Sequence, residues 1–220
     1  MAERAVRIPC GEIELEGRLA EADGSRAALV LHPHPLYGGD MDTAVVLALA
    51  RLFHRAGFRV LRFNFRGVGE SGGRHGGGGP ERLDVASARD WLRAGGAEEI
   101  WAAGYSFGAW VLAGAPEGFA GLILVSPPVA LLDFGSPSPL PALRLVVTGE
   151  RDPIAPARRI APLVPLWNPD AAFTVIPGAD HFYTGTLGKL TEAAARALRP
   201  RREGPDFGLS AGPDPTDRRA

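Results

Sequence analysis

The stretch from Ile100 to Ala113 reads Ile-Trp-Ala-Ala-Gly-Tyr-Ser-Phe-Gly-Ala-Trp-Val-Leu-Ala, two apolar runs joined by Gly-Tyr-Ser-Phe-Gly. This order predicts a strand, a sharp turn and a helix, with Ser106 on the turn. A serine at such a turn takes a strained backbone conformation that exposes its hydroxyl. Gly104 and Gly108 fit this geometry, because side chains there would collide where strand and helix pack closely. The stretch therefore predicts a nucleophile, provided that a base lies nearby in the fold.

Apolar segments alternate with amphipathic ones on both sides of this turn. Residues 6–10 and 13–18 alternate apolar and polar side chains around Gly11, which predicts an antiparallel hairpin at a sheet edge. Buried strands are expected at 27–32, 58–65, 100–105, 121–125, 143–148 and 173–176, and helices at 43–55, 81–93 and 187–198. On the helix 81–93, the residues expected to face the sheet are Leu83, Val85 or Ala86, and Trp91. This alternation predicts an α/β fold with a mostly parallel, doubly wound sheet and helices on both faces.

The segment between residues 125 and 143 is short and contains five prolines, so it cannot hold a folded cap domain. We expect a single domain over residues 1–199. From Arg199 the composition turns to Arg, Gly, Pro and Asp, which predicts a disordered tail at 200–220.

The bulk composition is that of an ordinary globular protein. The 220 residues are 45% hydrophobic and 22% charged, with a net charge of -1, so nothing indicates a nucleic-acid partner. Cys10 is the only cysteine, which excludes an internal disulfide. The N-terminus lacks the apolar region of a signal peptide, and no apolar run reaches membrane-spanning length. We expect a cytoplasmic protein without a membrane partner, and a homo-oligomer is compatible with the sequence.

Two further polar residues follow predicted strands. Asp152 comes after the strand 143–148 and His181 comes after the strand 173–176. Because reactive groups in a doubly wound sheet gather at the C-terminal ends of its strands, Ser106, Asp152 and His181 are expected to meet. An imidazole, with an ordinary pKa near 6.5, can take the serine proton at neutral pH. The carboxylate would fix the imidazole tautomer. Serine, acid and histidine in this chain order predict a catalytic triad.

A tetrahedral intermediate also needs two N–H donors aimed at its oxyanion. The backbone N–H of Phe107, directly after the serine, is expected to supply one. The turn after the strand 27–32 is expected to supply the other, where Pro33 and Pro35 have no N–H. That leaves three candidates, of which the first is favoured: His34, Leu36 and Tyr37.

With these residues the chain resembles the α/β-hydrolase superfamily over roughly residues 5–198. It is similar to a small lidless group of bacterial hydrolases with a His-Pro-His-Pro…Gly-Gly turn, here at 32–39, and an Asn-Phe-Arg-Gly-Val-Gly-x-Ser-x-Gly loop. That loop reads Asn64-Phe65-Arg66-Gly67-Val68-Gly69-Glu70-Ser71-Gly72, followed by unusually many glycines at 76–79. The resemblance implies a serine hydrolase fold with Ser106, Asp152 and His181 as its triad. The missing lid argues against a lipase-like interfacial mechanism.

Several features of the sequence allow other interpretations. Residues 67–72 match a dinucleotide-binding Gly-x-Gly-x-x-Gly pattern, but more glycines follow instead of a helix. His32 and His34 could form a metal pair, but such a site needs further His or Asp ligands after other strands, and Asp152 and His181 are better explained together. Asp180 is a rival acid, although adjacent residues rarely face each other as acid and base must. Ser126 also follows a strand, and we expect it in the pocket wall.

The sequence thus predicts hydrolysis of a carboxylic ester or thioester through an acyl-enzyme on Ser106, with no metal and no cofactor. The alternatives left open are a dienelactone-hydrolase-like or peptidase-like activity on the same triad, and a non-catalytic binding protein on the same fold.

Overall fold

A computed structural model describes residues 1–135 and 138–199 of the chain. Within these residues eight strands form one sheet, in the order β1-β2-β4-β3-β5-β6-β7-β8. β2 is antiparallel to β1 and to β4, and the other neighbouring pairs are parallel. The strands are β1 (Arg4–Cys10), β2 (Ile13–Ala20), β3 (Arg26–Leu31), β4 (Arg59–Phe63), β5 (Glu99–Tyr105), β6 (Gly121–Val125), β7 (Leu143–Gly149) and β8 (Ala172–Ile176). The predicted tail at 200–220 lies outside the described residues.

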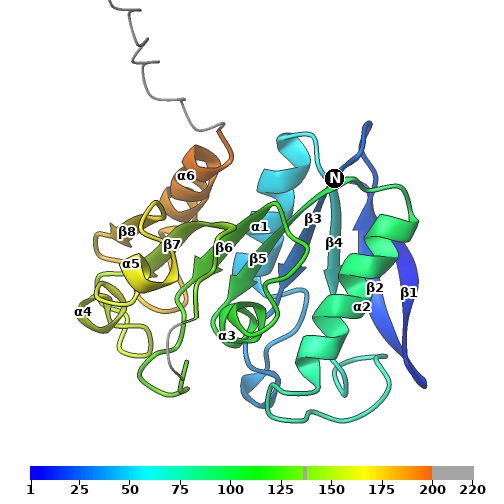
Figure 1. Cartoon of the computed structure of the whole chain (residues 1–220), viewed down its shortest axis with the longest axis horizontal. Coiled ribbons are helices and arrows are strands. Elements are labelled where there is room, and N and C mark those ends of the chain that lie inside the picture. The colour runs from blue at the N-terminus through cyan, green and yellow to red at the C-terminus, as the bar shows by residue number, and fades with distance from the viewer. Residues whose placement is uncertain (136–137, 200–220) are drawn as a thin grey trace, which may run out of the picture.

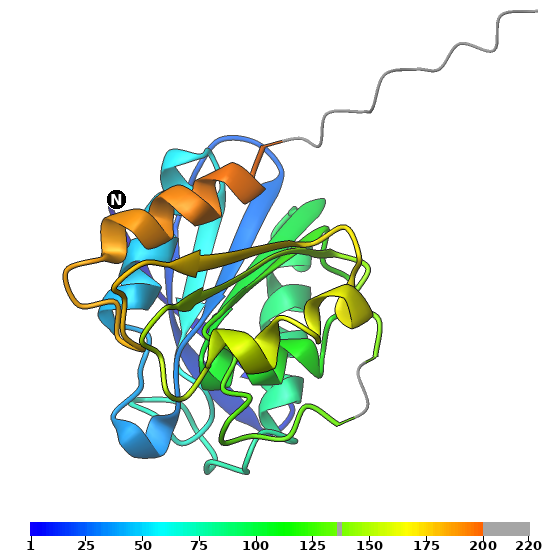
Figure 2. The same ribbon diagram turned by 90° about the vertical axis from the view of Figure 1, so that its left-hand side faces the viewer.

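Helices cover both faces of this sheet (Figure 1). α1 (Ala44–Arg55) and α6 (Leu187–Ala197) share one core cluster, and α2 (Glu81–Ala94) and α3 (Phe107–Ala113) share the other. Two one-turn helices, α4 (Ala157–Ile160) and α5 (Val164–Trp167), add to the cluster of α2 and α3. In Figure 2 the sheet separates α6, in orange, from α5, in yellow. The predicted doubly wound architecture is therefore confirmed.

Alternation along the central strands builds these two cores. In β3, Leu29 and Leu31 belong to the cluster of α2 and α3, whereas Ala28 and Val30 belong to the cluster of α1 and α6. All four side chains are fully buried, so β3 reads as a continuous apolar run because both of its faces are covered. The edge hairpin of β1 and β2 shows the alternation of buried and exposed residues that its sequence predicts.

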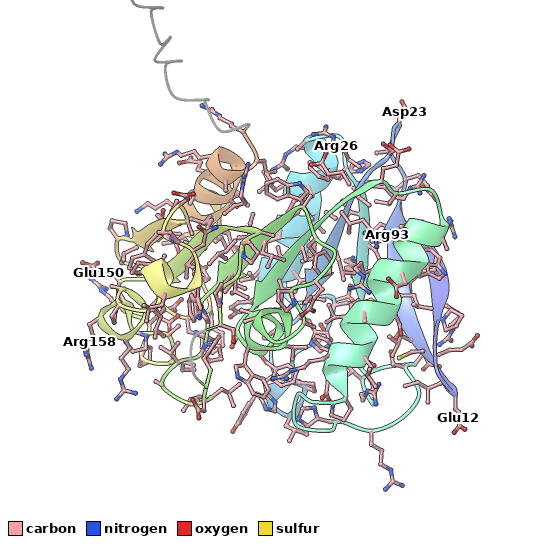
Figure 3. The ribbon with its side chains drawn as sticks, viewed as in Figure 1. Glu12, Asp23, Arg26, Arg93, Glu150 and Arg158 are labelled. Atoms are coloured by element: carbon pink, nitrogen blue, oxygen red, sulfur yellow. The ribbon has the colours of Figure 1, made fainter. Side chains whose placement is uncertain are left out.

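Several charged side chains lie around the periphery of the molecule. Figure 3 labels Glu12 on the turn of the edge hairpin, Asp23 after β2, and Glu150 and Arg158 near the opposite edge, all directed away from the sheet. These four residues are exposed. No helix in residues 1–135 or 138–199 is long and apolar enough to cross a membrane.

One part of the α2 prediction is wrong. Leu83 does not face the sheet: it is 62% exposed, while Val85 is buried and Trp91 packs partly against the core. The buried face of α2 instead includes Glu81 and Asp84, at the helical spacing that Val85 and Ala88 continue. Both carboxylates are buried because they bind the glycine-rich loop before the helix, which apolar side chains could not do.

Within residues 1–135 and 138–199, no cap domain covers the C-terminal ends of the strands. The segment between β6 and β7 contains no helix or strand in its described residues, 126–135 and 138–142. The loops that follow β3, β5, β7 and β8 therefore meet at an uncovered edge of the sheet, where the predicted site residues lie.

Candidate active site

Ser106 lies on the sharp turn between β5 and α3. Its backbone has φ 53° and ψ −117°, a conformation that non-glycine residues rarely adopt. A Cβ atom at Gly104 would collide with the carbonyl oxygen of Gly108, and one at Gly108 would lie 2.7 Å from the carbonyl oxygen of His32. The glycines are therefore required by close packing, as the sequence predicts, and the turn holds the Ser106 hydroxyl at the edge of the sheet.

His181 bridges the serine and the acid. Its Nε2 atom lies 3.0 Å from Ser106 Oγ, and its Nδ1 atom lies 2.8 Å from Asp152 Oδ2. A carboxylate can only accept, so Nδ1 carries the proton and Nε2 is left to accept the serine hydroxyl. The three predicted residues thus form one hydrogen-bonded chain, although they come from loops after three different strands.

Asp152 is held as an ionised acceptor. Its Oδ1 atom accepts the N–H groups of Ile154 and Ala155, at 2.9 and 2.8 Å. Burial raises the pKa of this carboxyl, but hydrogen bonding and charge from His181, with bonds from Ala155 and Ser126, outweigh burial and leave the pKa below its ordinary value. The rival Asp180 instead accepts the backbone N–H of Thr184. Asp152, and not Asp180, is therefore the acid that contacts His181.

Two backbone N–H groups remain open beside Ser106. Phe107 is the first residue of α3, so its N–H has no acceptor within the helix. In the turn after β3, the N–H of Leu36 binds His34 Nδ1 and the N–H of Tyr37 binds the His34 carbonyl. Among the described residues no acceptor is found for the N–H of His34. Of the three predicted donors, only His34 is therefore available.

The turn and the serine loop are in direct contact. The ring centroids of His34 and Phe107 lie 4.8 Å apart, and His75 packs against both rings at 5.0 and 5.4 Å. Behind them, the buried carboxylate of Glu81 accepts the N–H groups of Gly76 and Gly78, at 2.7 and 2.6 Å, and lies 2.9 Å from His75 Nδ1. The glycine-rich loop thus supports the two open N–H groups from outside.

A pocket of about 760 Å³ opens at Ser106 and His181. Its wall is mainly apolar, and its polar lining residues are Ser106, His181, the His34 turn, Thr43 and Tyr105. Exposed side chains at its mouth are Tyr37, Leu131 and Phe182. The pocket therefore suits a substrate with an apolar portion and a polar group at Ser106.

His32 does not form a metal pair with His34. Its Nδ1 atom lies 2.7 Å from the carbonyl oxygen of Pro33, and its Nε2 atom accepts the N–H of Phe65 at 3.0 Å. Burial lowers the pKa of this imidazole to about 4, so the ring is neutral. Across residues 1–135 and 138–199, no three His, Cys, Asp or Glu side chains gather as metal ligands would. Both ring nitrogens of His32 thus fix the turn that carries His34.

The Gly-x-Gly-x-x-Gly pattern forms a tight turn. Gly67 N–H bonds to the carbonyl of Gly72, whose own N–H bonds to Glu14 of β2. Arg66 pairs with the buried Asp84, so it is not directed at a substrate. α2 begins only at Glu81, well after the pattern, whereas a dinucleotide fingerprint opens a helix directly. The pattern is therefore structural.

Sequence reasoning missed a group of buried hydroxyls behind the site. Ser126, expected in the pocket wall, is fully buried outside the pocket lining, and its Oγ atom lies 2.8 Å from the hydroxyl of Tyr183. Tyr105 donates its hydroxyl to the carbonyl oxygen of His181 at 2.9 Å. No spacing in the sequence indicates these bonds, because each joins segments that only the fold brings together.

Comparison with known proteins agrees with the fold. No family model matches the chain. An uncharacterised protein of Rickettsia prowazekii, RP471, is 37% identical over 198 residues, 83% of each chain. An α/β serine hydrolase homologue from Coxiella burnetii is 34% identical, with a TM-score of 0.84 over 90% of this chain and 99% of that one. XC6422 from Xanthomonas campestris, an α/β serine hydrolase without a lid, is 28% identical, with a TM-score of 0.82 over 90% and 94%.

Proposed function

The chain belongs to the α/β serine hydrolases, and on that premise we propose that it hydrolyses a carboxylic ester or thioester through an acyl-enzyme on Ser106. The observation that carries the proposal is the chain of bonds from Ser106 through His181 to Asp152, at 3.0 and 2.8 Å, at the base of a mainly apolar pocket.

The first half of the reaction forms the acyl-enzyme. Ser106 Oγ attacks the substrate carbonyl carbon while His181 Nε2 takes the hydroxyl proton. Ionised Asp152 holds the ring and stabilises the imidazolium. The oxyanion of the tetrahedral intermediate accepts the N–H groups of Phe107 and His34, each of which is worth roughly 3 kcal/mol in the transition state. Collapse of the intermediate breaks the ester or thioester bond, and His181 returns the proton to the leaving alcohol or thiol.

The second half releases the acid. A water molecule gives its proton to His181 Nε2 and attacks the acyl carbon, and the same two N–H groups hold the second oxyanion. Collapse breaks the bond between the acyl carbon and Ser106 Oγ, His181 Nε2 returns its proton to that oxygen, and the carboxylic acid leaves. Every group needed belongs to the chain itself, so this route uses no metal and no cofactor.

The pocket restricts the substrate class. Its volume of about 760 Å³ and apolar wall favour an ester of small or medium size with an apolar acyl or alcohol part. Because no described part of the chain forms a lid over the mouth, a longer acyl chain would extend past Tyr37 and Phe182 into solvent, where it gains little binding energy.

The experiment is a panel of p-nitrophenyl esters of increasing acyl length, run beside thioesters, lactones and peptide amides. We expect ester or thioester turnover by the wild type and loss of nearly all turnover in Ser106→Ala. Ser71→Ala is the matched control, because it removes another buried serine hydroxyl, one that bonds to Asn64 and Glu16 away from the pocket. Preferential lactone or peptide cleavage would select the dienelactone-hydrolase-like or peptidase-like alternative. No turnover of any substrate would favour a binding protein.

A further inference from the structure

A third ring, that of His75, lies against the two residues that offer the open N–H groups. The ring centroids of His34 and Phe107 lie 4.8 Å apart, and the centroid of His75 lies 5.0 Å from the first and 5.4 Å from the second. These are the separations of aromatic rings in contact. The three rings come from three segments: the turn after β3, the start of α3 and the glycine-rich loop before α2. Because each ring contacts the other two, His75 fixes how the turn and the helix start lie relative to each other.

A buried carboxylate holds His75 in this place. Glu81, the first residue of α2, is fully buried. It accepts the N–H groups of Gly76 and Gly78 at 2.7 and 2.6 Å, and its Oε1 atom lies 2.9 Å from His75 Nδ1. A charge is buried only where such partners replace water. These partners belong to the segment 75–78, so the carboxylate fixes the conformation of the loop that carries His75.

The same loop also packs against α3. Gly78 is buried with φ 104°, and a Cβ atom there would collide with the ring of Trp110. Only glycine allows this close approach. Trp110 lies one turn after Phe107 on α3, and the centroids of these two rings are 5.9 Å apart. The loop therefore contacts the helix of the first N–H donor at two points, through His75 and through Gly78.

His75 lies outside the substrate pocket. The described residues that line the pocket include His34, Ser106 and Phe107, but His75 is not among them. Its side chain is 16% exposed and packs against the outer side of the rings that do line the pocket. Any effect of His75 on the reaction therefore passes through the positions of the two N–H groups.

We propose that His75 is a positioning residue of the oxyanion hole, because its ring sets the positions of the N–H groups of His34 and Phe107. The buried Glu81 holds that ring in place. This inference rests on the proposed function. An oxyanion donor is effective only when it is aimed, before the reaction, at the place where negative charge develops. Since one donor lies on the turn after β3 and the other on α3, a ring from a third segment supplies their alignment without occupying the pocket.

Two variants separate the ring of His75 from its ring nitrogen. His75→Asn keeps a side-chain N–H near Glu81 and removes the ring, whereas His75→Phe keeps an aromatic ring and removes the nitrogen. In His75→Asn kcat should fall by about tenfold to a hundredfold, with KM unchanged, because both oxyanion donors lose their alignment. In His75→Phe the ring contacts remain, so kcat should stay within about threefold of the wild type.

His54→Asn is the matched control. It makes the same change at a half-buried histidine in the last turn of α1, which packs on the opposite face of the sheet from α2 and α3. We expect wild-type kcat and KM in this variant, with any loss confined to the melting temperature.

Inhibition by a trifluoromethyl ketone reports on the oxyanion hole directly. Ser106 Oγ bonds to the ketone carbon while its proton passes to His181 Nε2, and the ketone oxygen becomes an oxyanion that accepts the two N–H groups. The inhibition constant should rise in His75→Asn by the same factor by which kcat/KM falls. A ring that only stabilises the fold would lower the melting temperature and leave kcat and the inhibition constant at their wild-type values. That result would overturn the inference.

A second variant acts without changing His75 and guards against loss of folding. Glu81→Gln has nearly the same shape, but its amide has one acceptor oxygen for the two loop N–H groups. The loop should loosen, so we expect kcat to fall by about threefold to tenfold and the inhibition constant to rise to match. Wild-type values of both in Glu81→Gln would also overturn the inference.

These outcomes separate the two proposals. If the wild type turns over esters and the variants of His75 and Glu81 match it, the role of His75 is wrong and the proposed function stands. If the wild type turns over no substrate in the panel, the proposed function fails and this inference fails with it.

Discussion

Tyr105 and His181 are joined by a hydrogen bond of 2.9 Å from the phenol hydroxyl to the backbone carbonyl oxygen. The residue directly before the proposed nucleophile thus anchors the proposed base, 76 positions further along the chain. Burial raises the pKa of the Tyr105 phenol, so it remains a donor. The bond ties the loop after β8 to the end of β5 and sets how far His181 lies from Ser106.

Replacing Tyr105 by Phe should weaken both folding and turnover. The carbonyl of His181 would lose its donor in a buried place, which costs about 1–3 kcal/mol of unfolding free energy. A looser His181 should lower kcat roughly tenfold. Urea unfolding and steady-state kinetics measure the two effects. A variant with wild-type kcat and lowered stability would limit Tyr105 to a structural role.

Asp152→Asn tests the assignment of the acid. The amide no longer stabilises the imidazolium and favours the wrong ring tautomer, so kcat should fall by about 10⁴-fold, with KM little changed. The matched control is Asp180→Asn, which keeps an acceptor for the N–H of Thr184 and should stay within about twofold of wild type. If kcat fell further in Asp180→Asn than in Asp152→Asn, Asp180 would be the acid that supports His181.

Gly39→Ala tests the second oxyanion donor. A Cβ at Gly39 would lie 2.8 Å from the carbonyl oxygen of His34 and would collide with the carbonyl of Pro33, so the turn must shift. Misplacing one oxyanion donor should lower kcat by about 10²-fold. Gly188→Ala is the control, because a Cβ at this exposed helical glycine meets no atom within 4 Å. Equal kcat values in the two variants would exclude the His34 turn from the reaction.

The lowered pKa of His32 should make the free energy of unfolding depend on pH. Its pKa is about 4 in the folded chain against 6.5 ordinarily, so below pH 6.5 the unfolded chain binds a proton that the folded chain does not. The free energy of unfolding is therefore unaffected by His32 above pH 6.5. It should decrease by about 3 kcal/mol as the pH falls from 6.5 toward 4. Urea unfolding across this range measures it, with His32→Asn as the comparison. Parallel pH profiles of the two proteins would contradict the prediction.

Leu131→Ser tests the role of the apolar mouth. Leu131 is 66% exposed and lines the pocket, so the change should lower kcat/KM for the longer acyl esters about threefold to tenfold and spare acetyl esters. Leu83 is 62% exposed on α2, away from the pocket, which makes Leu83→Ser a matched control. A fall of the same size for every acyl length would place Leu131 outside the acyl path.

The fold was predictable because its signals are local. Buried strands such as β3 read as apolar runs, and the glycines around Ser106 report a close approach of two backbones. The one-turn helices α4 and α5 are too short to show a helical period. The prediction for Leu83 fails because sequence reasoning places apolar residues, and not carboxylates, on the buried face of a helix. In α2 the carboxylate of Glu81 is buried instead, because it binds two backbone N–H groups.

The candidate site, like the fold, could be predicted from the sequence only in part. Because Ser106, Asp152 and His181 each follow a predicted strand, the sequence predicts that they meet. The prolines of the turn after β3 limit the second N–H donor to three residues. Only the folded structure selects among these three residues, because the selection depends on which N–H groups are already bonded within the turn. Ser126 and Tyr183 had no signal in the sequence, since a bond between two strained loops exists only in the assembled fold.

The central claim is that Ser106 is the nucleophile, and labelling with a fluorophosphonate probe tests it most directly. The wild type should gain one phosphonyl group, which peptide mapping by mass spectrometry should locate on Ser106. Ser106→Ala should gain none, and Ser71→Ala should be labelled like the wild type. An unlabelled wild type, under conditions where known serine hydrolases react, or equal labelling of Ser106→Ala would contradict the account.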